Sequence, residues 1–275
     1  MEPITRRNSS GYNKRIQYRM LEILWRHLES NSPGTLDDAQ LNDLDVVRGP
    51  DLDVDNPVPL DFEPRFFAPC HGEVASLPLL CQRRRLTPVP SNIYKGVNQE
   101  DMSFGSPIGD CPDNAGLYMT GHYMVPTAAD TPHLGITMLN PTVAREGEML
   151  ECELKAAVVC LWAQKRFKKF TDHHTKPVLI FTFQSETHAR ITQAHMDSKT
   201  NKIIIRQSRQ FDLIGAPREP PADAYLLLRW LLNSPVGATK YEDEQLPSEG
   251  EITKGAGAGG AEMPVVSKTV GVKSG

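Results

Sequence analysis

Short stretches between residues 117 and 211 alternate apolar with polar positions, and this period of two predicts β-strands. The stretch 177–183, PVLIFTF, is instead a nearly unbroken apolar run, which is typical of a central strand covered on both faces. The polar turn DSKTN between two of the stretches predicts a β-hairpin. The expected strands cover residues 117–125, 133–139, 177–183, 189–196 and 202–211.

Helical periodicity frames this region on both sides. Residues 14–30 carry apolar side chains at i, i+3 and i+4 spacing, which predicts an amphipathic helix. Such a helix docks on the core of its own domain or inserts into the groove of a partner. Residues 221–233 predict a short apolar helix, because proline is suited to a helix start and the following Ser-Pro pair ends it.

The stretch 149–170, MLECELKAAVVCLWAQKRFKKF, allows two interpretations of its first turns. As a helix that starts near Glu148, it has a continuous apolar stripe and consists mainly of helix formers, so we favour this interpretation. As a strand over 149–155, it places Glu153 and Lys155 on the same side, since side chains two positions apart share a face of a strand. Both interpretations continue as a helix with a basic end.

Together these elements predict an α+β fold, with a small mixed β-sheet of about five strands, a long central amphipathic helix and flanking helices. We expect a docking helix within residues 1–31. Residues 32–60 are acidic, contain several prolines and lack periodicity, so they predict a disordered linker. The globular domain is expected over 61–236, and the low-complexity stretch 237–275 predicts a disordered tail.

Composition narrows the class of protein. The chain has 275 residues and a formal net charge of −4, which argues against a polycation that wraps nucleic acid but leaves local basic patches as candidate contacts. No apolar run reaches the ~18–20 residues of a membrane span, and the first residues lack the apolar core of a signal peptide. We therefore expect a cytoplasmic or nuclear protein that is not secreted and has no membrane partner. The five cysteines include no C-x-x-C pair, which argues against a structural zinc site.

With residues 149–155 extended, the order of elements becomes three strands, a helix and a strand, and Glu153 and Lys155 form an E-x-K pair on the third strand. That arrangement resembles the PD-(D/E)XK nuclease-like superfamily. The resemblance implies that Glu153 and an aspartate hold Mg²⁺ and that Lys155 assists the attacking water. Asp130, just before the second strand, is the candidate aspartate, although it lies in an expected turn and no Pro-Asp pair precedes that strand.

A second resemblance covers residues 133–239. The segments HLGITMLNP, LECELKAAV, PVLIFTF, HARITQAHMD and WLLNSPVG resemble a family of uncharacterised filamentous-fungal proteins. This resemblance implies an intracellular fungal protein and carries no activity with it.

Two functions stay open from the sequence. The first is a non-catalytic α+β protein that acts through contacts with a protein partner, because no complete catalytic constellation accompanies the predicted fold. The second is a Mg²⁺-dependent nuclease or phosphodiesterase with Glu153, Lys155 and Asp130 as catalytic residues and nucleic acid as partner. The histidines at 173, 174, 188 and 195 are interpreted as surface or hydrogen-bonded side chains rather than metal ligands, since their spacing does not converge on one site.

Overall fold

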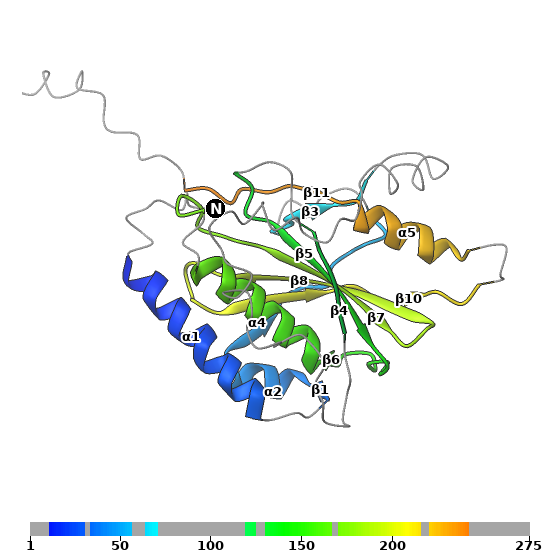
Figure 1. Ribbon diagram of the computed structural model, residues 1–275, viewed down its shortest axis with the longest axis horizontal. Helices are drawn as coiled ribbons and strands as arrows, with labels where there is room; N and C mark the ends of the chain where they lie inside the picture. The colour runs from blue at the N-terminus through cyan, green and yellow to red at the C-terminus, as the bar shows by residue number, and fades with distance from the viewer. Residues whose placement is uncertain are drawn as a thin grey trace, which may run out of the picture. The chain divides into compact units, whose positions relative to one another are not determined.

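A mixed β-sheet forms the centre of the fold in the computed structural model (Figure 1). The structure describes residues 11–30, 34–56, 64–70, 119–124, 130–166, 170–215 and 220–241, all within one unit, Met1–Glu242. The strands follow one another in the order β2 (Val46–Arg48), β9 (Ile203–Gln207), β8 (His188–Met196), β7 (Val178–Gln184), β5 (Leu134–Asn140) and β4 (Met119–Met124). β10 (Phe211–Asp212) also pairs with β8. Two short ladders join β1 (Thr35–Leu36) to β6 (Met149–Leu150) and β3 (Phe67–Ala68) to β11 (Ser234–Pro235).

Helices cover both faces of this sheet. β5 and β7 are parallel, so the chain must cross over between them, and α4 (Glu151–Arg166) makes the crossover. α1 (Gly11–Ser30) packs beside α4 on the same face, near the short α2 (Asp38–Asp43) (Figure 1). α5 (Ala222–Leu231) belongs to a separate apolar cluster on the other face. The α+β class is therefore confirmed, with a sheet larger than the five strands expected.

The strand β7 explains why its sequence is apolar throughout. Val178 and Ile180 pack into the cluster with α1 and α4, whereas Leu179 and Phe181 pack into the cluster with α5. All four side chains are fully buried. Alternate side chains of a strand point to opposite faces, so a strand covered on both faces needs apolar residues at successive positions. The prediction of a central strand over 177–183 is confirmed.

The stretch 149–155 is helical after a two-residue strand, so its extended interpretation is wrong. β6 ends at Leu150 and α4 begins at Glu151. The carboxylate of Glu153 accepts a hydrogen bond from the backbone N–H of Leu150 at 3.1 Å, which satisfies one of the donors that a helix start leaves open. The favoured helix interpretation is confirmed, with its start a few residues later than expected.

The expected disordered linker over 32–60 is wrong for the part that the structure describes. Asp37 caps α2 with a full capping box, in which Asp37 and Gln40 each accept a hydrogen bond from the other's backbone. β2 then pairs in parallel with β9. The side chains of Leu41 in α2 and Val46 in β2 are buried in the core. Asp37 acts here as a helix cap, and Asp53 accepts hydrogen bonds from the backbone N–H groups of Asp55 and Asn56.

The expected tail begins too early at 237. Residues 239–241 lie against the segment 172–175. The backbone N–H of Tyr241 donates to Asp172 O at 3.1 Å. Residues 242–275, expected to be disordered, and residues 71–118 of the expected globular domain lie outside the described residues. Among the helices that are described, none has the length and apolar character needed to cross a bilayer.

Candidate metal centre

Glu153 and Lys155, the predicted E-x-K pair, both lie on α4 but belong to two different ion pairs. Side chains two positions apart on a helix point in different directions, so they do not share a site. Lys155 Nζ lies 3.0 Å from Glu151, one turn earlier. Glu153 is fully buried, and Arg190 of β8 donates to both of its carboxylate oxygens, at 2.6 and 3.2 Å. Gln207 of β9 adds a third hydrogen bond at 3.0 Å. The described donors to the Glu153 carboxylate are Leu150, Arg190 and Gln207. Because Arg190 and Gln207 belong to the sheet, this carboxylate holds α4 against the sheet.

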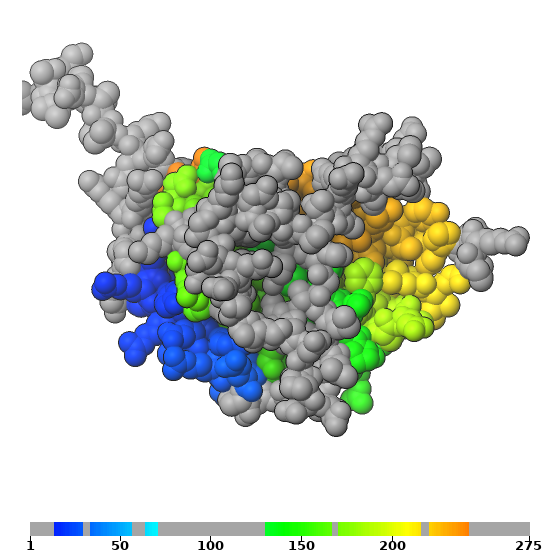
Figure 2. All heavy atoms as spheres, viewed as in Figure 1, coloured from blue at the N-terminus to red at the C-terminus, as the bar shows by residue number. Residues whose placement is uncertain are grey.

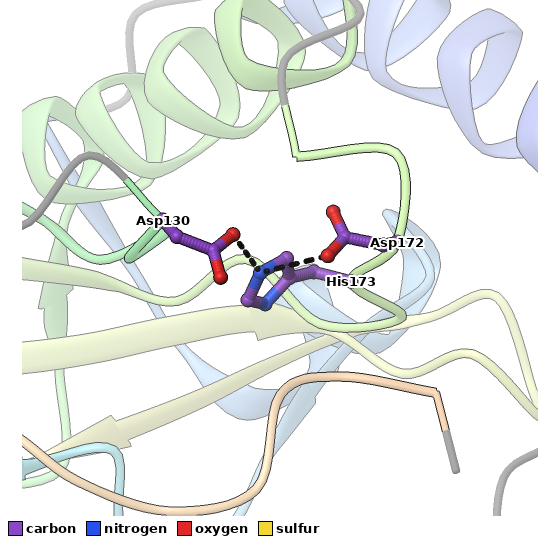
Figure 3. Close-up of side chains that lie close together, drawn as sticks. All are labelled: Asp130, Asp172 and His173. Atoms are coloured by element: carbon purple, nitrogen blue, oxygen red, sulfur yellow. Dashed lines mark hydrogen bonds and ion pairs between the residues drawn. The ribbon is translucent and has the colours of Figure 1, made fainter. Parts of the chain in front are cut away.

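Asp130, the third predicted residue, belongs to a different cluster (Figure 3). One ligand atom each from Asp130, Asp172 and His173 lies within 4.8 Å of the others. His173 Nε2 is 3.2 Å from Asp130 Oδ1 and 3.7 Å from Asp172 Oδ2. The metal role predicted for Asp130 therefore acquires two candidate partners, neither of which is Glu153.

Local structure orients the His173 ring toward the two carboxylates. The backbone at Phe170 has a positive φ of 57°, and the N–H of His173 closes the turn on Phe170 O at 3.2 Å. The ring is buried, at 3% exposure, and its Nδ1 lies 2.8 Å from the hydroxyl of Thr239. A hydrogen bond at one ring nitrogen fixes the orientation of the imidazole, and with it the direction in which the other nitrogen points. His173 Nε2 is thereby aimed at Asp130 and Asp172.

Lys240 supplies the positive charge of this cluster. Its ammonium forms a hydrogen-bonded ion pair with Asp130 and lies 3.9 Å from Asp172 Oδ2. The hydrogen bond from Lys240, and then that from His173, lowers the pKa of Asp130 below its ordinary value. The carboxylate is therefore ionised at neutral pH, as a metal ligand must be. A metal ion at the same place would have to displace the Lys240 ammonium.

The donor set indicates which ions fit. One imidazole nitrogen and two carboxylate oxygens combine a ligand preferred by zinc, iron and nickel with ligands accepted by manganese. Mg²⁺ favours oxygen ligands and a nearly ideal octahedron, so it fits a site with a central imidazole less well. The cluster is thus better suited to Zn²⁺ or Mn²⁺ than to the Mg²⁺ expected from the sequence.

A group of lysines lies beside the cluster of Asp130, Asp172 and His173, near the end of α4. Lys176 Nζ donates to Gln164 O at 3.0 Å, where a cation meets the carbonyl end of the helix. Burial, and then the positive charges of Lys165 and Lys14, lowers the pKa of Lys176 to about 7. Burial, and then Lys14, lowers the pKa of Lys165 to about 8.

The buried Lys176 gives the stability of the fold a pH dependence. Its pKa falls from 10.5 to about 7 on folding, so between these values the unfolded chain binds a proton that the folded chain has released. The free energy of unfolding is then expected to rise with pH from about 7 toward 10.5, and Lys176→Met is expected to flatten that rise. Urea unfolding at several pH values measures it, with Lys199→Met at the exposed surface as control; an unchanged slope in Lys176→Met would contradict it.

Sequence reasoning did not select Asp172 or Lys240 as site residues, and it interpreted His173 as a surface or hydrogen-bonded histidine rather than a metal ligand. The adjacent Asp-His pair was visible in DHHTK, and a buried histidine beside a carboxylate is a familiar metal-ligand arrangement. The contribution of Thr239 and Lys240 was hidden, because these residues follow the stretch predicted to end the fold. An isolated antiparallel bridge between His173 and Lys240 brings the two segments together.

No protein-family model matches the chain, and no curated protein or solved structure is significantly similar to it. The resemblances to the fungal family and to the PD-(D/E)XK superfamily therefore stay predictions. Fold and site together describe an α+β protein with a candidate metal centre at one end of its sheet.

Proposed function

We propose that this chain is a non-catalytic accessory protein that holds a divalent transition-metal ion, Zn²⁺ or Mn²⁺, between Asp130, Asp172 and His173. The observation that carries the proposal is the convergence of their three ligand atoms within 4.8 Å. We assign the ion a structural role, in which it ties together the separate segments that supply its ligands.

A bound ion would join segments that lie far apart in the sequence. Asp130 precedes β5, whereas Asp172 and His173 lie in the loop before β7. Thr239, hydrogen-bonded to the His173 ring, brings in the end of the described chain. An ion that binds the folded chain and not the unfolded one stabilises the fold in proportion to the logarithm of its concentration. We infer that the ion fixes the ends of these loops and so keeps a surface for a protein partner in one conformation.

Titration of the metal-stripped chain with Zn²⁺ or Mn²⁺ tests the proposal. Isothermal titration calorimetry is expected to show one ion per chain, and the melting temperature is expected to rise with ion concentration and fall again on addition of EDTA. Asp172→Asn removes one charged ligand from a half-exposed position and is expected to weaken binding at least about tenfold. Failure of the unaltered chain to bind either ion would end the proposal.

Two further variants separate ligation from general electrostatics. Lys240→Gln removes the ammonium that competes with the ion, so it is expected to tighten binding by up to about fivefold. Asp43→Asn removes an exposed carboxylate from α2 and is the matched control for Asp172→Asn. Equal weakening by both aspartate variants would mean that the ions follow net charge and not this cluster.

A further inference from the structure

The meeting point of α1 and α4 carries a patch of positive charge. The two helices pack side by side, and the first turns of α1 lie against the last turns of α4 (Figure 1). Residues 14–21 of α1 and 162–166 of α4 contain no acidic side chain. We call the exposed or half-exposed basic residues of these turns the basic patch: Lys14, Arg15, Arg19, Lys165 and Arg166. Part of α1, coloured blue, lies at the surface in Figure 2.

The two lysines of the patch donate their hydrogen bonds to neutral oxygens. Lys165 Nζ donates to the side-chain oxygen of Gln17 at 2.6 Å, and Lys14 Nζ donates to Thr171 O at 3.3 Å. In the part of the chain that the structure describes, neither lysine forms an ion pair with a carboxylate. Crowded like charges create a local potential that attracts anions, even on a chain whose net charge is −4.

Planar side chains run through the middle of the patch. The rings of Tyr18 and Trp162 are stacked, with centroids 5.7 Å apart and planes inclined by 26°. The guanidinium of Arg166 lies 5.1 Å from the Trp162 centroid. Both rings are partly buried at the seam between the helices, and Trp162 also packs against the apolar core. This arrangement places flat, partly accessible groups within a row of cations.

We propose that the basic patch binds single-stranded nucleic acid, with its lysines and arginines on the phosphates and Tyr18 and Trp162 beside the bases. Cations that follow a phosphodiester backbone and aromatic rings that stack on bases are the two components of sequence-tolerant single-strand binding. A regular duplex keeps its bases stacked inside and presents phosphates alone, so it uses half of this surface. The patch adjoins the cluster of Asp130, Asp172 and His173, since Lys14 Nζ donates to Thr171 O. None of its residues is one of the three candidate metal ligands.

Binding is measured by the fluorescence anisotropy of a labelled 20-nucleotide oligo(dT) or oligo(U) titrated with the full chain. We expect saturable binding that weakens with salt and exceeds binding to a duplex of the same length. The variant Lys14→Gln/Arg15→Gln/Arg19→Gln, which changes exposed side chains, is expected to weaken binding more than tenfold. It is also expected to reduce the slope of log K against log salt by about 2, because three phosphate contacts are lost at about 0.7 each.

Controls distinguish this partner from other anions. Arg26→Gln lies on the same helix beyond the patch and is expected to leave binding nearly unchanged. Trp162→Leu keeps the charges and is expected to reduce the preference for single strands over duplex. Absence of oligonucleotide binding, equal binding by the triple variant, or tighter binding to vesicles containing phosphatidylserine would each overturn the proposal. The metal-stripped chain is expected to bind the oligonucleotide as well as the loaded chain, so this proposal and the metal proposal fail separately.

Discussion

Arg190→Met is expected to destabilise the fold by about 3–5 kcal/mol, because it leaves the fully buried carboxylate of Glu153 without its cation. Arg190 and Glu153 are 4% and 0% exposed, so water cannot replace the lost partner. Urea unfolding followed by circular dichroism measures the loss. A loss below about 1 kcal/mol, the range of surface ion pairs, would mean that the pair does not hold α4 to the sheet.

The double variant Glu153→Gln/Arg190→Met separates an unpaired charge from a lost contact. The glutamine side chain can still accept the hydrogen bond that the Leu150 N–H donates to residue 153 and the one that Gln207 donates. Because it carries no charge, the cost of burying an unpaired carboxylate disappears. The double variant is therefore expected to be more stable than Arg190→Met alone. If the double variant is no more stable than Arg190→Met alone, the unpaired charge of Glu153 is not the source of the loss.

Trp230→Ala is expected to cost about 3–5 kcal/mol, the range for removing a large aromatic side chain from a core. Trp230 of α5 is fully buried, and its indole N–H donates to Val54 O at 3.2 Å. The same ring lies 5.9 Å from the guanidinium of Arg65. Thermal or urea unfolding measures the change, which is expected to be accompanied by loss of order around residues 52–56.

Two neighbouring changes serve as controls for Trp230→Ala. Leu231→Ala removes a half-buried side chain from the same helix and is expected to cost markedly less. Trp230→Phe keeps most of the packing but loses the hydrogen bond to Val54, so an intermediate cost of about 1–3 kcal/mol is expected. If Leu231→Ala costs as much as Trp230→Ala, the buried ring is not the main source of stability in this region.

Sequence periodicity predicts the strands and helices whose signal is local. β7 can be predicted from its apolar run and α1 from its amphipathic stripe, because the residues that define each element are close to one another in the sequence. The segment 34–56 carries no such period. Its apolar residues Leu41, Val46, Leu52 and Val54 are held by partners far along the sequence, such as β9 and α5. A capping box at Asp37 and Gln40 was a local signal that this segment was structured.

The candidate site is less accessible to sequence reasoning for the same reason. Asp130 was a candidate because it precedes a predicted strand. Its partners are far along the chain, with His173 43 residues away and Asp172 beside it. Glu153 and Lys155 fit a motif by spacing alone, and spacing has opposite meanings on a strand and on a helix. The start of α4 at Glu151 decided between them.

The parallel pairing of β2 with β9 has a consequence for any shortened form of the chain. A fragment that begins at residue 61, the predicted start of the globular domain, would lack Val46–Arg48 and leave β9 as an open edge. Ile203 and Ile205, buried in the full chain, would line that edge. Unpaired strands with apolar side chains are templates for pairing between molecules, so β2 protects β9 from pairing with another copy of the chain.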